Sequence, residues 1–328
     1  MNKLFTYIRL KDWWSFIIPP IISFYYLQLL TKDTKLLSFY NISFDFINFI
    51  LLSIFVAAFG FFLNEWSDIN DDKIAGKKNV LYNLSKKKIK FYFIFIVLVN
   101  ILAILFIDWN PFTILLLTTQ YLLFITYSVY PFRLKRNKYA TLIIDALYSG
   151  TLFYILAFTI KSKIIEINFL QVTLIFIWGF IKGIRNIIHH LIQDEKHDKK
   201  LQIKTIATTT NYKNLLHFAT YFLIPFEVLI FTFFLYTVPY NYFFLVSYLL
   251  FFLYVLNRKK HIIPFLLKRN QEIKTNKFTD INLYYEILLP LLSLFLLSVR
   301  DNRFIIIFLL GFIINKIIIN IITNTTRI

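Results

Sequence analysis

Two short acidic segments carry the side chains of this 328-residue chain that are best suited to chemistry. The first is Asn64-Glu-Trp-Ser-Asp68-Ile-Asn-Asp-Asp72, and the second is Asp194-Glu-Lys-His-Asp198. Because residues four positions apart lie on one face of a helix, each segment would present its acids as a row. Carboxylate and amide oxygens suit Mg²⁺, which commonly shares its coordination with substrate phosphates. The spacing therefore predicts a site for divalent metal and a polyphosphate.

The composition indicates a polytopic membrane protein. The chain is 58% apolar and 20% aromatic, with only 6 Gly and 8 Pro, which is too apolar for a soluble domain of this length. Its formal charge of +18 would suit nucleic acid, but the basic residues cluster in short loops between apolar runs, so no nucleic-acid partner is expected. The absence of cysteine excludes disulfides and thiolate metal sites. The run from Trp13 to Leu30 is expected to be a first span rather than a cleavable signal.

The apolar runs predict nine or ten transmembrane helices, since a bilayer core needs about 20 mostly apolar residues per helix. The last two runs are separated only by Arg300-Asp-Asn-Arg303, so they are two spans or one broken span. No linker divides the chain, and we expect one all-α membrane-embedded domain over residues 1–328. The predicted spans are 13–30, 43–63, 91–108, 111–130, 141–160, 168–188, 216–236, 239–256, 281–299 and 303–322.

The distribution of Lys and Arg predicts the orientation. Most of them lie in the N-terminus and in the loops 64–90, 131–140, 189–215 and 257–280, which alternate with sparsely charged loops. By the positive-inside rule the basic loops face the cytoplasm, so we expect an integral protein of the cell (inner) membrane. Both acidic segments then fall on the cytoplasmic side, although they did not enter the assignment. The sparse charges of the opposite side are Lys32, Lys35, Lys161, Lys163, Arg300 and Arg303.

Two other interpretations of the acids stay open at this point. Acids after a membrane helix also occur as solvated interfacial charge, although two pairs on one side, one of them with Asn64 a turn earlier, favour a metal site. His189, His190 and His197 near the second segment raise zinc as an alternative ion. The oxygen-rich remainder of the site favours magnesium.

The motifs resemble those of the UbiA superfamily of intramembrane prenyltransferases. The first segment is similar to the NDxxDxxxD motif of that family, with Glu65 replacing the usual second-position Asp, and the second is similar to its DxxxD motif. The run from Tyr127 to Lys135 resembles the YSxxPxRLK segment between the two motifs, and His190 to Thr205 resembles the HQLRD…D…GxKT run. The resemblance extends from about residue 5 to at least residue 250.

Three features depart from or loosen the family pattern. Leu191 stands where some members carry a further Asp, and Gln202 replaces the Gly of the GxKT run. Gly76-Lys-Lys-Asn79 stands where the family often has a basic stretch containing Pro. The departures bear on the acceptor more than on diphosphate binding.

The resemblance implies a helical fold around a central cavity that opens toward the lipid, and a Mg²⁺-dependent reaction of an isoprenyl diphosphate. Asp68 and Asp72, supported by Asn64, would hold one Mg²⁺, and Asp194 and Asp198 a second. The ions would clamp the diphosphate. Its further partners would be Lys77, Lys78, Arg133, Lys135, Lys204 and the hydroxyl of Tyr127. Asp145, Glu286 and His190 are candidates for lining the acceptor site or the cavity, although Asp145 and Glu286 are equally expected as paired interior polar residues.

Three functions remain in competition. The first is transfer of an isoprenyl group to a lipophilic, aromatic or other, acceptor with release of diphosphate. The second is a terpene cyclase of the same fold, in which a double bond of the isoprenoid itself replaces the acceptor. The third is a cation transporter, which predicts acids deep within the spans rather than at their ends.

Overall fold

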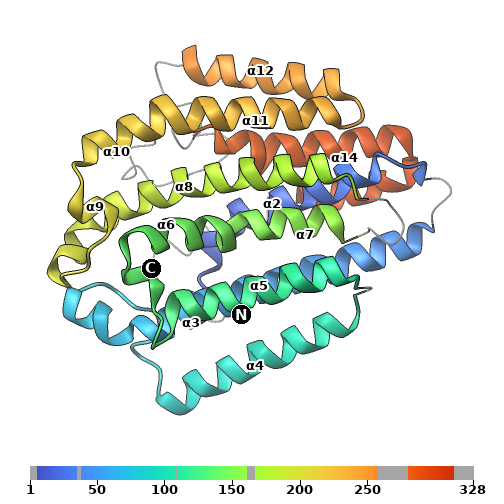
Figure 1. The fold of residues 1–328 in the computed structure, drawn as a ribbon. Helices are drawn as coiled ribbons and strands as arrows, with labels where there is room; N and C mark the ends of the chain where they lie inside the picture. Colours follow the sequence, from blue (N-terminus) through green and yellow to red (C-terminus); the bar gives the residue numbers. More distant parts are fainter. Residues whose placement is uncertain (1–5, 35–37, 108, 161–166, 258–279, 314–328) are drawn as a thin grey trace.

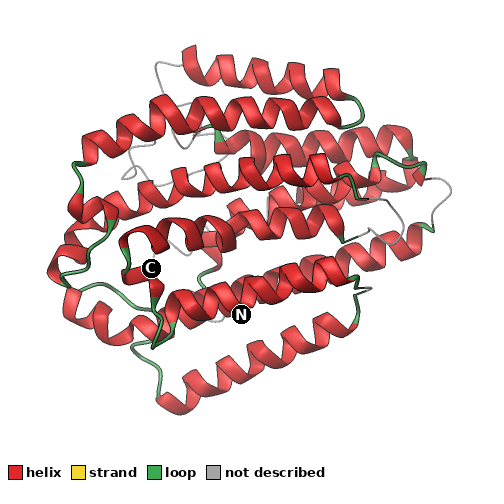
Figure 2. Cartoon of the chain, viewed as in Figure 1, coloured by secondary structure: helices red, strands yellow, loops and turns green. Residues whose placement is uncertain are grey.

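The computed structural model describes residues 6–34, 38–107, 109–160, 167–257 and 280–313. Within these ranges the chain is built of helices and short connections, without a strand (Figure 2). Most of the predicted basic loop 257–280, together with Lys35, Lys161 and Lys163, lies outside the described residues. The helices run roughly alongside one another in one bundle (Figure 1).

The helices follow the apolar runs of the sequence. The tenth predicted run is described as far as residue 313, and a break at Asp301 separates it from the ninth. The elements are α2 (Leu10–Leu29), α3 (Phe39–Ala75), α4 (Lys86–Leu105), α5 (Pro111–Ser128), η2 (Leu134–Arg136), α6 (Lys138–Ala146), η3 (Leu147–Thr151), α7 (Leu152–Thr159), α8 (Phe169–Lys200), α9 (Ile206–Thr209), α10 (Tyr212–Phe218), η4 (Ala219–Leu223), α11 (Ile224–Thr237), α12 (Asn241–Asn257), η5 (Tyr284–Leu288), α14 (Leu289–Arg300) and η6 (Asn302–Phe304).

Among the described residues, six helices are long and apolar enough to cross a membrane, which confirms the all-helical polytopic fold. They comprise α3, α4, α5, the continuous α6–α7, α8 and the continuous α10–α11. Two further predicted spans overlap shorter apolar helices, Asn241–Asn257 and Asn302–Ile313, so the number of spans stays a prediction.

Two helices extend well beyond the length that a bilayer requires. α3 has 37 residues and α8 has 32, whereas about 20 suffice to span the apolar core. Both extensions lie at the C-terminal ends of the helices and carry the two acidic segments. The acids therefore stand on continuous, rigid helices rather than on loops, as the four-residue spacing predicts.

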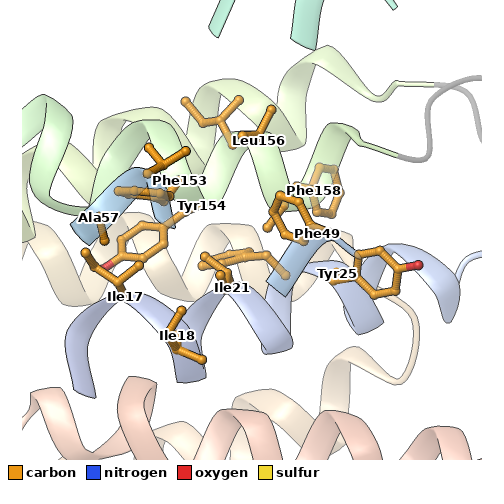
Figure 3. Close-up of a cluster of buried hydrophobic side chains, with 14 of the residues drawn as sticks. Ile17, Ile18, Ile21, Tyr25, Phe49, Ala57, Phe153, Tyr154, Leu156 and Phe158 are labelled. Atoms are coloured by element: carbon orange, nitrogen blue, oxygen red, sulfur yellow. The ribbon is translucent and has the colours of Figure 1, made fainter. Parts of the chain in front are cut away.

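α2 lies in the middle of the bundle and packs against α7, α14 and α3. Figure 3 shows how side chains of α2, such as Ile17 and Ile21, meet Phe49 of α3 and Phe153 of α7 in a buried cluster. α6 and α8 approach still more closely, because a Cβ added at Gly183 would lie 2.6 Å from the Cα atom of Ala146. Small residues permit such contacts between membrane helices.

Paired charges hold α8 to its neighbours deep inside the bundle. Arg185 Nε lies 2.6 Å from Oε2 of Glu227 on α11, and the two side chains are 1% and 0% exposed. Arg185 also donates to Asn282 Oδ1 at 2.6 Å. One turn earlier, Lys182 donates to the Tyr154 hydroxyl at 2.9 Å and lies within electrostatic range of Glu286. All of these charged residues lie in apolar runs of the sequence. Only Glu286 among them was a candidate site residue from the sequence alone.

Removing one partner of the Arg185–Glu227 pair should destabilise the fold. Glu227→Gln leaves the Arg185 guanidinium without its buried counter-charge, and we expect a loss of about 3 kcal/mol. Glu195→Gln is the matched control. Glu195 lies on α8, the helix of Arg185, and pairs with Lys199 at a partly exposed position, so this pair should contribute about 0.5 kcal/mol. Thermal unfolding in detergent measures both. Equal shifts in the two variants would contradict the assignment.

Candidate active site

The first acidic segment forms the C-terminal turns of α3, with Asn64, Asp68 and Asp72 one turn apart. Asn64 Oδ1 accepts hydrogen bonds from Lys135 Nζ at 2.8 Å and from Ser128 Oγ at 3.3 Å. The helix ends after Ala75 because Gly76 adopts a left-handed conformation with φ of 70°, which glycine tolerates without strain. The chain then turns back toward the acids.

The segment between α5 and α6 supplies cations to this row of acids. Arg133 donates to Asp68 Oδ1 and to the Ser67 carbonyl at 2.8 and 3.1 Å, and it pairs with Asp71 at 2.8 Å. Its backbone is also left-handed, with φ of 39°, and its side chain is 5% exposed. Lys135 donates to Asp68 as well. The segment from Tyr127 to Lys135, which resembles YSxxPxRLK, therefore contacts the first acidic segment.

The second acidic segment lies near the end of α8 and meets the first through a lysine. Lys77, in the loop after α3, donates to Asp194 Oδ2 at 2.9 Å. Asp198 lies one turn further along and within electrostatic range of Asp68. The structure thus brings both motifs to the same end of the bundle, around one site.

The cations of the site differ in their protonation behaviour. Burial is the largest influence on Lys135 and lowers its pKa from the ordinary value, although Asp68 opposes this effect. Burial also acts to lower the pKa of Lys77, but the attraction and hydrogen bond of Asp194, with a contribution from Asp72, raise it overall. Lys77 is therefore held as a cation between the two motifs.

A polar group of side chains lies on the inner side of the acids. Tyr127 is buried, and its ring centroid is 5.0 Å from that of Tyr148, whose hydroxyl donates to Asp145 Oδ2 at 2.7 Å. Tyr127 is within electrostatic range of Asp68, and Asp145 is within range of His190 on α8. The structure therefore brings Tyr127, Asp145 and His190 to the neighbourhood of the motifs.

The remaining predicted residues lie further away or at the surface. Lys78 and Lys204 are exposed. Glu286 belongs to the buried group around Lys182, which lies about 18 Å from Asp194 along α8 at 1.5 Å per residue. Glu286 is only partly buried, and both of its expected roles stay predictions.

Three acidic or amide side chains of this region have partners in the structure that their sequence positions did not reveal. Asp71 pairs with Arg133 and Arg136, Glu65 pairs with Arg9, and Asn79 donates to Asp72. The basic run at 133–136 was the feature of the sequence that could have predicted a partner for Asp71. For Glu65 the signal was its departure from the family motif.

The donor set fits magnesium as a shared ion rather than as an ion in a protein cage. In the described ranges no group of three or more His, Asp or Glu side chains is arranged to hold a metal by itself. Two rows of oxygen donors instead face one site, as expected for Mg²⁺, which is commonly bound by one or two carboxylates, waters and substrate phosphates. The histidines of α8 do not form a cluster of the kind that a structural zinc ion requires.

Arg133 should stabilise the ligand-free site through its fork of donors. Arg133 Nη2 contacts Asp68, Asp71 and the Ser67 carbonyl, while Nη1 donates to the Tyr130 hydroxyl at 2.9 Å. The single ammonium of Lys cannot hold both sets of partners, so we expect Arg133→Lys to cost about 2 kcal/mol. Arg136→Lys is the matched control, since Arg136 is 41% exposed and should contribute about 0.5 kcal/mol through its pair with Asp71. Thermal unfolding in detergent again separates the two. A larger effect at Arg136 would refute the arrangement.

Comparisons with known proteins agree with this architecture. A UbiA homolog from Archaeoglobus fulgidus bound to GPP and Mg²⁺ has a TM-score of 0.64 and 17% identity, over 90% of this chain and 99% of that chain. The homolog bound to DMAPP and Mg²⁺ gives a TM-score of 0.61 and 17% identity, over 89% and 98% of the two chains. A structure from work on digeranylgeranylglyceryl phosphate synthase in membranes gives 0.50 and 17%, over the full length of both chains. At these identities the likeness shows a common fold.

The sequence itself identifies the family. A comparison with curated proteins finds no match. The model of the UbiA prenyltransferase family matches residues 15–264, which is most of the chain. The protein is thus an integral membrane protein that belongs to the UbiA prenyltransferase family.

Proposed function

We propose that this protein is a Mg²⁺-dependent prenyltransferase that moves an isoprenyl group from an isoprenyl diphosphate to a lipophilic, aromatic or other, acceptor. The observation that carries the proposal is the meeting of the two acidic motifs, from α3 and α8, at one site with Lys77 bonded across to Asp194. Family membership supports it, as do similar folds whose structures hold GPP or DMAPP together with Mg²⁺.

In this proposal the acids bind the metal ions, and the cations bind the diphosphate directly. We assign Asp68 and Asp72, with Asn64, to one ion and Asp194 and Asp198 to a second. Bound ions neutralise the charge that accumulates on the departing diphosphate. In the ligand-free state Lys77, Arg133 and Lys135 neutralise the acids. We assign contact with the diphosphate oxygens to these three cations and to the Tyr127 hydroxyl.

The reaction follows from this arrangement. The allylic C–O bond breaks and its electron pair leaves with the diphosphate. We place the allyl cation toward the buried ring pair of Tyr127 and Tyr148, because aromatic rings attract positive charge. A bond then forms between the acceptor and the allylic carbon, and the acceptor loses a proton. We assign Asp145, held by Tyr148, and His190 to contact with the acceptor.

The exposed lysines serve at the entrance in this scheme. Lys78 and Lys204 lie at the same end of the bundle as the acids and attract an anionic substrate to the site. We place this end on the cytoplasmic side of the cell (inner) membrane. The placement is supported by the concentration of Lys and Arg there, compared with the sparse charges around Lys32 and Arg300 at the other ends of α2 and α14.

A terpene cyclase of the same fold is the second candidate, because it needs the same diphosphate site. A cation transporter is disfavoured, because the motif acids stand at helix ends, and two of the deeper acids are already bonded, Glu227 to Arg185 and Asp145 to Tyr148.

Loss of one metal-binding carboxylate from either motif should strongly lower the rate of diphosphate release. We expect Asp68→Ala and Asp194→Ala each to lower the Mg²⁺-dependent rate by about 100-fold or more, as for removal of a charge-stabilising group. Glu195→Gln is the matched control, because Glu195 neighbours Asp194 but pairs with Lys199. Release of inorganic diphosphate from farnesyl or geranylgeranyl diphosphate, measured with a lipophilic acceptor present, reports the rate. Intact release in both alanine variants would refute the site.

Incubation without acceptor distinguishes the transferase from the cyclase. A transferase should release little diphosphate until a lipophilic acceptor is added, because the allyl cation has no partner. Mass spectrometry of the lipid extract then shows a prenylated acceptor. A cyclic hydrocarbon or alcohol formed from the isoprenyl diphosphate alone would overturn the transferase proposal.

A further inference from the structure

Glu65 differs from the acids beside it because it is bonded into the protein. It precedes Asp68 by three residues and Asp72 by seven, so its position on α3 borders their row. Its side chain is 6% exposed. Oε1 accepts from Arg9 at 2.6 Å, and Oε2 accepts from the backbone N–H of Val80 at 3.3 Å. The carboxylate therefore joins the N-terminal segment to the loop that follows α3.

Asn79 fastens the same loop at a second point. Its Nδ2 donates to the Glu65 carbonyl at 2.9 Å and to Asp72 Oδ2 at 2.8 Å. Its Oδ1 accepts from the N–H of Leu81 at 2.9 Å, and the Leu81 side chain is buried in the core. The loop is thus folded back onto α3 and cannot swing freely from Gly76.

This fastening fixes the backbone from which Lys77 reaches across the site. The Lys77 N–H donates to the Asp72 carbonyl at 2.8 Å, and its carbonyl accepts from the Tyr82 hydroxyl at 3.2 Å. With its backbone held, Lys77 loses mainly side-chain freedom when its ammonium meets Asp194. A free loop would add the entropy of several backbone residues to that loss.

We propose that Glu65 is a positioning residue, which with Arg9 and Asn79 forms a clamp that holds Lys77 between the two acidic motifs. The role of Lys77 toward the diphosphate rests on the proposed function, whereas the clamp itself does not. The proposal also accounts for Glu at the position where the motif usually has Asp. The extra methylene group lets the carboxylate bond to Arg9 and to the Val80 N–H at once.

The first experiment tests the clamp without any substrate. Hydrogen–deuterium exchange of the purified protein should show faster exchange of the 78–84 segment in Glu65→Gln and in Arg9→Gln. Arg9→Lys, which keeps the charge, should restore part of the protection. Asp12→Asn is the matched control, because Asp12 lies 2.6 Å from the same arginine but has no bond to the loop. Unchanged exchange in Glu65→Gln, or an equal change in Asp12→Asn, would overturn the clamp.

The second experiment tests whether the clamp acts through Lys77. We expect Glu65→Gln to raise the KM for the isoprenyl diphosphate about fivefold with little change in kcat, and Lys77→Ala to raise it further. If Glu65 acts only by placing Lys77, then Glu65→Gln should add nothing in the Lys77→Ala background. Additive effects would overturn the positioning role. A wild-type protein that releases no diphosphate even with lipophilic acceptors present would count against the proposed function instead, and the exchange experiment would still decide the clamp.

Discussion

The site depends on one constraint, which is that charges carried to the edge of an apolar bundle need counter-charges. α3 and α8 end in rows of carboxylates, and bringing the two rows together is unfavourable unless cations stand between them. Lys77 pairs with Asp194, and Arg133 and Lys135 pair with Asp68. The connections after α3 and α5 supply these cations, so the loops are as necessary to the site as the helices that carry the acids.

The same constraint operates inside the bundle. α8 runs without interruption from the buried pair of Arg185 and Glu227 to the acids at its end. A buried pair with two hydrogen bonds fixes the rotation of α8 relative to α11, because turning the helix would leave both charges unpaired. The close contact of Gly183 with Ala146 fixes α8 against α6. The direction in which Asp194 and Asp198 point is therefore set far from the site itself.

Much of this architecture could be predicted from the sequence. The apolar runs located the helices, but the predicted span 43–63 stopped short of the end of α3 at Ala75. The four-residue spacing of Asn64, Asp68 and Asp72 was the sign that a helical face could continue there. The partners of the charges were harder to predict, because Arg9 and Glu65 are 56 positions apart and Lys77 and Asp194 are 117 apart. Such pairs depend on how the helices pack, and the periodicity of residues along the chain does not show which helices are neighbours. The buried charges of α8 were hidden for the same reason, because Lys182 and Arg185 interrupt an apolar run without forming a motif.

The most direct test of the central claim is a structure of the protein with Mn²⁺ and an unreactive isoprenyl thiodiphosphate, in which anomalous scattering locates the metal. The account predicts two metal positions, one against Asp68 and Asp72 and the other against Asp194 and Asp198, with the diphosphate between them. Metal at only one motif, or a diphosphate bound away from both, would contradict it.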